Sequence, residues 1–225
     1  AIVSHDHGGL GLDPLTWAML VEELGRGWTT VAAIVTAHSV AADAVARFGT
    51  ESQRARLLPA MVRGDVLGAG AFTETVPARR DKDDWVLAGG CPALDGAAQA
   101  GLLIVRAVTD RGPACLLVAP GATGVTLGPP LPTLGARGLG VSALRLDGAR
   151  VHPSSVLGGE PGRGDEQATA ALRLARLGVA ATAVGLAQAA FEAALRYSQE
   201  RVTFGKPIGQ HQAIQLKLAD MATGI

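Results

Sequence analysis

Few segments of this sequence combine residue types and spacing that could do chemistry. The strongest is RVTFGKPIGQHQ (201–212), which places Arg201, Thr203, Phe204 and Gln212 around a Gly-Lys-Pro turn. By residue type alone, these four are typical of an exposed turn with a surface arginine, a buried phenylalanine and a glutamine facing a helix. A function for this turn therefore needs support from the rest of the chain.

The other candidate sites are weaker. The triplet HDH (5–7) could bind a metal, but such a triplet in a loop is more often solvated. Cys91 and Cys115 lack the paired spacing of a metal knuckle, so we expect reduced, partly buried thiols in a cytoplasmic protein. GEPGRG (159–164) lacks the strand and the Lys-Ser/Thr pair of a phosphate-binding loop. We expect no metal site, and we interpret His38 as a core histidine whose ring is hydrogen-bonded.

Composition narrows the possible partners. Hydrophobic residues make up 48% of the 225 residues and aromatic residues only 4%, so the core must be built mainly from Ala, Val and Leu. The 20 basic residues balance the 20 acidic ones, which leaves no net field to attract nucleic acid or an anionic membrane. The chain does not open with a charged stretch followed by an apolar run, so we expect no signal peptide and a cytoplasmic location.

Three helices are expected in the first part of the chain. An Asp-Pro pair at 13–14 is a typical helix start, and the apolar pattern after it runs to Gly25. A second helix begins after Thr30 and stops before Gly49, and a third covers about 51–62. Together these helices predict a compact helical unit.

The pattern then changes to short strands. Between residues 65 and 157, apolar runs are separated by Gly, Pro and Asp, which is typical of a small barrel or sandwich. The runs are VLGAGAF, WVLAG, GLLIVRAV, ACLLVAP, GVTLG and SALRLDG. The segment GGEPGRGDE (158–166) is expected to link the last strand to a C-terminal helical region.

Helical periodicity returns in the last part of the chain. Residues 168–201 contain no proline and predict one long helix of a bundle, and a second helix is expected from about Gln210. Charged residues such as Arg173 interrupt the apolar stretch, so we expect no membrane span. The predicted fold is an α+β multidomain chain. Its parts are a helical N-terminal domain (1–64), a central β-domain (65–158) and a C-terminal helical bundle (159–225).

This order of elements and four sequence blocks resemble the acyl-CoA dehydrogenase family, a group of FAD-dependent enzymes. HGGLGLD (7–13) is similar to the family's glycine-rich entry to a helix, and residues 48–74 resemble its N-terminal block ending in Thr-Glu. VLGGEPGRG (156–164) resembles the family's linker, and residues 183–221 are similar almost throughout. Both ends of the chain resemble cut positions, since family helices that flank these blocks are absent.

The resemblance implies roles for the turn at 201–212. In the family, this turn reaches across a dimer interface to the FAD that the neighbouring subunit mainly binds. Arg201 would pair with the pyrophosphate through bidentate charge-assisted bonds, and Thr203 would donate its hydroxyl to the same anion. Phe204 would pack on the cofactor and Gln212 would hydrogen-bond nearby. The resemblance also implies a homo- or hetero-oligomer arranged as a dimer of dimers.

The sequence departs from the family pattern where the chain's own flavin would lie. The family's Gly-Ser-Asp element is missing after Glu74, and its aromatic, hydroxyl and amide side chains are replaced over residues 89–96, where Asp95 brings a negative charge. Thr73 is the remaining expected flavin contact on this side. A minority of the family places the catalytic carboxylate just before an arginine that corresponds to Arg176, but here that residue is Ala175, which can take no proton.

The resemblance implies three alternative functions. The first is α,β-dehydrogenation of an acyl-CoA or acyl-carrier thioester with FAD as hydride acceptor, with Arg176 on the substrate side and a catalytic base outside this chain. The second is a non-catalytic subunit of a heteromeric enzyme that completes its partner's FAD site. The third is a flavin-free structural protein on the same fold.

Overall fold

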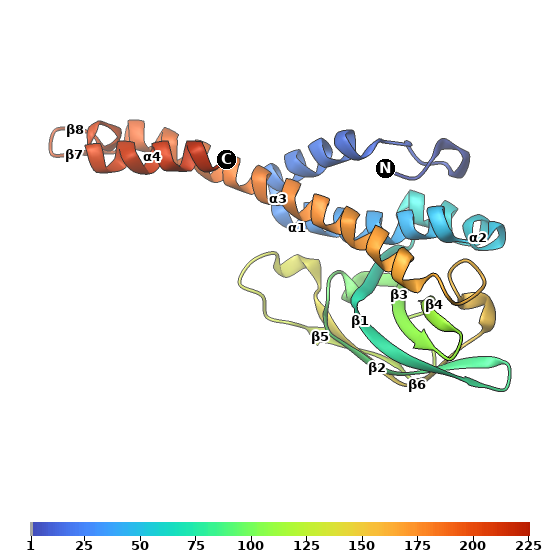
Figure 1. The fold of residues 1–225 in the computed structure, drawn as a ribbon. Helices are drawn as coiled ribbons and strands as arrows, with labels where there is room; N and C mark the ends of the chain where they lie inside the picture. The colour runs from blue at the N-terminus through green and yellow to red at the C-terminus, as the bar shows by residue number, and fades with distance from the viewer. Residues whose placement is uncertain (1) are drawn as a thin grey trace.

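The computed structural model of the chain describes residues 2–225. Helices come first, a six-stranded sheet is next, and two helices end the chain, as the sequence predicts. In Figure 1 the helices form a layer above the sheet, and the last two helices project to one side. The helices are α1 (Pro14–Phe48), α2 (Glu51–Arg63), α3 (Gly164–Glu200) and α4 (Gln212–Gly224). The strands are β1 (Leu67–Asp81), β2 (Asp84–Leu94), β3 (Ala100–Thr109), β4 (Gly112–Val118), β5 (Val125–Pro130), β6 (Ser142–Val151), β7 (Val202–Thr203) and β8 (Lys206–Pro207).

Helix α1 contains the two helices that the sequence predicts, joined across a kink. Asp13 caps its start, because its carboxylate accepts hydrogen bonds from the backbone nitrogens of Leu15 (2.9 Å) and Thr16 (3.1 Å). At Trp28 the backbone leaves the helical region, with φ −158° and ψ 98°. The kink therefore lies between Gly25 and Thr30, where the sequence predicts a break in the helical pattern.

Helix α2 is held at both ends by local hydrogen bonds. Thr50 and Gln53 form a capping box, and Gly64 ends the helix with φ 80°. The Gln53 amide also donates to the carbonyl oxygens of Ser154 (2.9 Å) and Val156 (2.7 Å), which joins α2 to the segment after β6.

His38 is a core histidine with both ring nitrogens hydrogen-bonded, as expected. The Gly68 backbone nitrogen donates to Nδ1 at 3.2 Å, so the ring proton is on Nε2, which lies 3.0 Å from the Met61 carbonyl oxygen. Burial lowers the pKa of this imidazole below its ordinary value. The neutral ring therefore ties α1 to α2 and to β1.

The central strands form one six-stranded sheet in the order β4-β3-β1-β2-β6-β5. Strand β1 runs parallel to β3 and antiparallel to β2. The sequence pattern predicts that this strand ends at Phe72, but the strand continues to Asp81 and includes Pro77. The pairing with β3 shifts between Ala71 and Val76, so the strand bulges outward over the residues between them.

The curled sheet has an interior of its own, which agrees with the predicted barrel or sandwich, although β4 and β5 leave it open at the edges. Successive residues of β3 face opposite sides. Leu103 and Val105 point into the interior of the sheet, whereas Leu102 and Ile104 pack against the helices. Two cores therefore meet across β3, and the helix layer is held firmly on the sheet.

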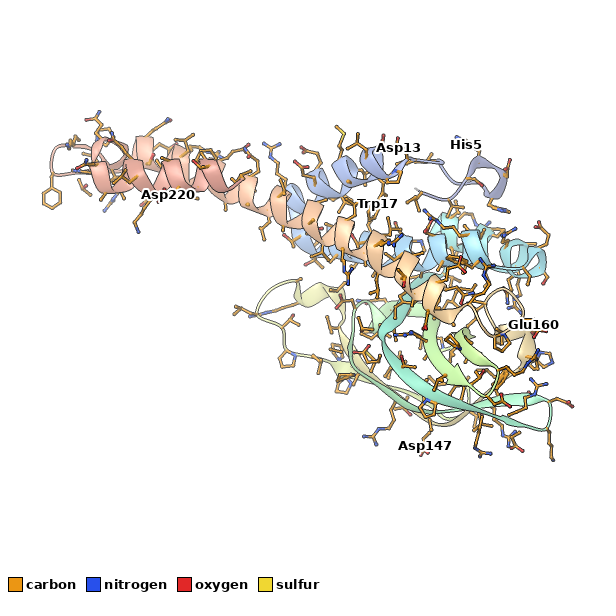
Figure 2. All side chains as sticks on the ribbon, viewed as in Figure 1. His5, Asp13, Trp17, Asp147, Glu160 and Asp220 are labelled. Atoms are coloured by element: carbon orange, nitrogen blue, oxygen red, sulfur yellow. The ribbon has the colours of Figure 1, made fainter. Side chains whose placement is uncertain are left out.

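Helix α3 contains 37 residues and packs along α1 through small residues. A Cβ on Gly185 would overlap the Glu22 carbonyl oxygen and would lie 2.8 Å from the Arg26 nitrogen. Beyond Gly185, Ser198 is the only buried residue of this helix. In Figure 2 the hairpin of α3 and α4, which carries Asp220, stands clear of the sheet, whereas Trp17 lies where α1 packs against α3.

Helices α1 and α3 are both long and apolar enough to cross a membrane by length and composition alone. Of the most apolar window, 56% is buried inside the protein in α1 and 33% in α3. Core helices of soluble proteins meet the same criteria. The absence of a membrane span therefore stays a prediction from the charged residues of α3.

Candidate functional site

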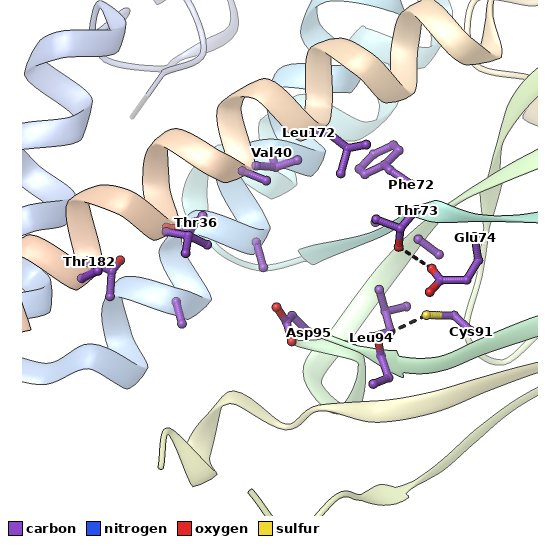
Figure 3. Close-up of a pocket in the computed structure, with 18 of the residues that line it drawn as sticks. Thr36, Val40, Phe72, Thr73, Glu74, Cys91, Leu94, Asp95, Leu172 and Thr182 are labelled. Atoms are coloured by element: carbon purple, nitrogen blue, oxygen red, sulfur yellow. Dashed lines mark hydrogen bonds between the residues drawn. The ribbon is translucent and has the colours of Figure 1, made fainter. Parts of the chain in front are cut away.

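A cavity of about 490 Å³ lies where α1 and α3 cross the end of the sheet (Figure 3). Its helix walls are mostly small and apolar, and its floor comes from β1 and β2. The bulge in β1 brings Thr73 and Glu74 to the floor, and the end of β2 contributes Cys91 and, just beyond the strand, Asp95. A volume of this size falls within the roughly 300–1,000 Å³ of typical small-molecule sites.

The polar groups of the floor differ in charge and in bonding. Thr73 donates to the Glu74 carboxylate at 2.6 Å, and this hydrogen bond lowers the pKa of Glu74. The Cys91 thiol donates to the Ala93 carbonyl oxygen at 3.2 Å, and burial raises its pKa to about 11. This thiol is therefore protonated at neutral pH.

Asp95 has a different environment. The side chain keeps access to solvent, but the protein packed around it withdraws enough water to raise its pKa. No hydrogen bond or ion pair from residues 2–225 reaches the carboxylate. The sequence predicts a negative charge beside the flavin position, and the structure puts Asp95 in the cavity lining.

Helix α3 carries Ala175 and Arg176, the two positions at which the family resemblance implies a base and a substrate-side arginine. Ala175 lines the cavity, so its methyl group occupies the place from which a minority of the family is expected to present a carboxylate. Arg176 is exposed and is not part of the lining, because the next residue of a helix points about 100° away. The structure therefore does not bring Arg176 to the cavity.

The turn at 201–212 is a small hairpin of β7 and β8. Phe204 and Gly205 both have positive φ, 50° and 77°. A left-handed conformation is unusual for an aromatic residue and is tolerated here beside glycine in a tight two-residue turn. The Phe204 side chain is 97% exposed, so the residue is not the buried phenylalanine that residue type alone indicates.

His211 organises this turn, a role that its residue type and position did not indicate. Its Nε2 lies 3.3 Å from both the hydroxyl and the carbonyl oxygen of Thr203, and its ring meets the Phe204 ring edge-on at 6.2 Å between centroids. Arg201 and Gln212 are exposed on either side. The four expected residues therefore share one exposed surface at the tip of the hairpin.

This surface does not face the cavity of the same chain. Figure 1 shows β7 and β8 at the far end of the projecting hairpin, whereas the cavity lies against the sheet. One chain thus carries two separate parts of a candidate site. Thr73 lies at the cavity, and the other expected flavin contacts lie at the hairpin tip. Within one chain the two groups do not meet.

Comparison with known families decides the relationship. The family description "Acyl-CoA dehydrogenase, N-terminal domain" matches residues 1–65, and "Acyl-CoA dehydrogenase, C-terminal domain" matches residues 162–225. The chain belongs to the acyl-CoA dehydrogenase family. The resemblance described from the four sequence blocks is confirmed.

Individual relatives agree with this assignment. The short-chain specific acyl-CoA dehydrogenase of Homo sapiens mitochondria is 34% identical over 99% of this chain and 58% of its own length. The structure of butyryl-CoA dehydrogenase from Megasphaera elsdenii is 32% identical with a TM-score of 0.91, and the match covers 99% of this chain and 63% of that one. A glutaryl-CoA dehydrogenase from Mycobacterium smegmatis, solved with FADH2, has 28% identity and a TM-score of 0.90, covering 96% and 58%.

This acyl-CoA dehydrogenase family member spans about three-fifths of the length of these relatives, as the shares of 58% and 63% state. The family assignment therefore covers the fold and the two matched regions. Activity, substrate and partners of the whole protein are matters for proposal.

Two features of the family member could not be recognised in its sequence. Thr36, which lines the cavity from α1, has a buried hydroxyl without a hydrogen-bond partner in residues 2–225. The bulge that presents Glu74 depends on the pairing of β1 with two different strands. Neither feature has a local sequence signal, because each depends on contacts between distant segments.

Proposed function

We propose that this chain forms part of an FAD-dependent oxidoreductase that dehydrogenates an acyl thioester at its α and β carbons. The observation that carries the proposal is the separation of two half-sites, a cavity at the sheet and an exposed Arg201 turn at the hairpin tip. A flavin dinucleotide has two ends that need different environments. A planar ring system fits an apolar cavity, and a pyrophosphate fits an exposed guanidinium.

The residues present fit these two ends. The cavity has small apolar walls at Ala33, Ala37 and Ala175 that leave room for a flat ring, and acceptors at its floor suit a ring N–H group. Arg201 has no salt-bridge partner among residues 2–225 and is free to bind an anion. Because the turn does not reach its own cavity, we infer that each complete site joins the cavity of one chain to the turn of another.

In this arrangement the bound flavin would accept the hydride from the substrate. Thr73 would contact the ring from the floor of the cavity, and the apolar walls would exclude water from the acyl chain. Arg201 and Thr203 would bind the pyrophosphate, and His211 would hold Thr203 in place. Phe204 would pack on the cofactor. Ala175 cannot accept the α proton, and the family resemblance implies a catalytic base beyond this chain in most members, so we propose that the base lies outside residues 2–225.

A second function is favoured by one specific observation. Ala175 and Ala93 both line the cavity at positions where the family resemblance implies a carboxylate or an aromatic side chain. A chain with this cavity could act as the non-catalytic subunit of a heteromeric enzyme, lending its Arg201 turn to a partner. A flavin-free structural role is the third alternative.

Visible absorbance of the purified protein separates these functions. The first function predicts a yellow protein with stoichiometric flavin, and it predicts bleaching by an acyl-CoA substrate once the segment that carries the base is also present. A colourless chain that becomes yellow only with a co-expressed relative would support the second function, and a colourless chain in both preparations would support the third.

Arg201→Ala tests the shared site directly. We expect this variant to lose flavin from the assembled protein, whereas Lys217→Ala, which removes an exposed cation from α4 of the same hairpin, should retain it. Equal flavin retention by the two variants would contradict the role of Arg201. Sedimentation of the loaded protein would test the proposed dimer of dimers, and cell fractionation would test the proposed cytoplasmic location.

A further inference from the structure

The charged residues that line the cavity are all acidic. They are Glu74 and Asp95, and no lysine, arginine or histidine of residues 2–225 belongs to the lining. Both carboxylates come from the sheet side, since Glu74 lies on the bulge of β1 and Asp95 follows the end of β2 (Figure 3). The floor of the cavity therefore carries negative charge that no described lining residue neutralises.

Glu74 keeps its charge at neutral pH. Its carboxylate accepts a hydrogen bond from the Thr73 hydroxyl at 2.6 Å, and that bond lowers the pKa of the side chain. A hydrogen bond to a carboxylate stabilises its ionised form. One negative charge is therefore fixed at the floor.

Asp95 adds a carboxylate that has no partner. No hydrogen bond or ion pair from residues 2–225 reaches it, and the protein packed around it raises its pKa by withdrawing water. A flat ligand seated on the floor would remove more of this water. Its removal would strengthen the interaction between the ligand and the carboxylate, because the local dielectric constant falls.

The other walls of the cavity offer no compensating charge. The Cys91 thiol is neutral at neutral pH, because burial raises its pKa to about 11. Helices α1 and α3 contribute only threonine, alanine, valine and leucine side chains to the lining. Negative charge that develops on a ligand in this cavity thus meets no cation among residues 2–225.

Hydride acceptance adds negative charge to a flavin. A hydride brings one proton and two electrons, so the neutral oxidised ring becomes an anion unless it also takes up a second proton. In the proposed function the hydride leaves the β carbon and the α proton goes to a base outside residues 2–225. The charge of the residues beside a flavin decides whether its reduced form is anionic or neutral.

We propose that Glu74 and Asp95 hold the reduced flavin in its neutral form, so that each hydride accepted is accompanied by uptake of one proton from water. The two carboxylates disfavour the anionic ring through like-charge repulsion. The acyl chain loses a hydride and a proton, and the ring gains a hydride and a proton, so the step balances. The inference rests on the proposed function, because it concerns the flavin of the same cavity.

Redox titration of the flavin-loaded, assembled protein from about pH 6 to about pH 8 tests the proposal. A tenfold change in proton concentration shifts the midpoint potential of a two-electron couple by about 30 mV for each proton taken up. We expect a slope of about 60 mV per pH unit, which corresponds to two protons, across this whole range. Free FAD in the same titration should change to about 30 mV per pH unit near neutrality, where its reduced ring loses a proton.

Two variants assign the effect to residues. Asp95→Asn and Glu74→Gln each remove one charge and keep the shape of the side chain. Each should favour reduction at about pH 8 roughly tenfold, which is about 30 mV, and should lower the slope there. Asp147→Asn removes a charge from the exposed side of β6 and should titrate like the unmodified protein. Because Glu74 also accepts the Thr73 hydroxyl, Asp95→Asn decides the matter if Glu74→Gln loses its flavin.

Failure of the proposed function and failure of the inference give different results. If the assembled protein holds no flavin, the proposed function is wrong and the inference fails with it. If the bound flavin has a slope of about 30 mV per pH unit above neutrality, or if Asp95→Asn changes neither potential nor slope, only the inference is overturned.

Discussion

Phe204→Asn is expected to raise stability and reduce flavin binding in the same protein. Phe204 has φ 50°, and a left-handed conformation costs a residue with a Cβ about 1–2 kcal/mol. Asn-Gly is the preferred pair for such a turn, so asparagine relieves most of this cost. The phenylalanine side chain is 97% exposed, and its edge-on contact with His211 is the aromatic interaction that the substitution removes.

The change in the free energy of unfolding is the relieved backbone strain less the lost aromatic contact. The aromatic contact contributes about 0.5 kcal/mol at an exposed site, so the net gain should be about 1 kcal/mol. For a chain of this size, that gain raises the melting temperature by about 2–4 °C. Thermal unfolding of the flavin-free protein by circular dichroism measures the gain, and absorbance of the assembled protein measures the flavin retained, which should fall because the aromatic surface is lost.

Lys82→Asn is the matched control. Lys82 has φ 55° in the turn between β1 and β2, far from the hairpin tip. We expect a similar rise in melting temperature without a change in flavin retention. A lower melting temperature for Phe204→Asn would refute the interpretation of the turn as strained, and unchanged flavin retention would refute the role of the exposed ring.

Three further predictions concern the rest of the fold. Burial holds the pKa of His38 below its ordinary value of about 6.5, so the unfolded state takes up the proton first as the pH falls. The free energy of unfolding should therefore decrease below about pH 6.5. Denaturant titrations of His38→Gln should lack this part of the pH dependence. Gly185→Ala should lower the free energy of unfolding by about 1–3 kcal/mol, since its methyl group would meet the backbone of α1. Gly27→Ala, with open space around the residue, should be neutral or stabilising. Equal melting temperatures for the two variants would contradict the close packing at Gly185. Burial raises the pKa of Cys91 to about 11 and that of Cys115 to about 12, so both thiols should resist a disulfide reagent at pH 8 until denaturant is added, and rapid modification of the native protein would refute their burial.

The elements with local signals were predictable from the sequence. The Asp-Pro start of α1 and the stop at Gly64 depend on a few neighbouring residues, and the structure has both. The end of β1 was predicted wrongly at Phe72, because the residues after it include Pro77 and lack an alternating pattern. They remain in a strand because β1 changes partner from β3 to β2, and this pairing is set by the whole sheet.

Some residues of the candidate site were also predictable from local sequence, and others were not. Arg201, Thr203, Phe204 and Gln212 lie within one short segment, so sequence similarity could identify them together. The cavity combines Thr36 of α1, Asp95 after β2 and Ala175 of α3, and the free hydroxyl and carboxylate are evident only when these segments are packed together. The exposure of Phe204 was also missed, because an aromatic residue is more often buried.

The length of α3 has a consequence for how the chain opens. Its first part is anchored by buried residues up to Gly185, but its last turns meet mainly α4 and the small hairpin. In the isolated chain, amide hydrogens near Ala171 should exchange with solvent only through global unfolding, whereas those near Leu195 should exchange through local fraying. Protection from hydrogen exchange would thus decrease along the single helix α3. Pairing with another chain would slow exchange only at the exposed C-terminal end of this helix.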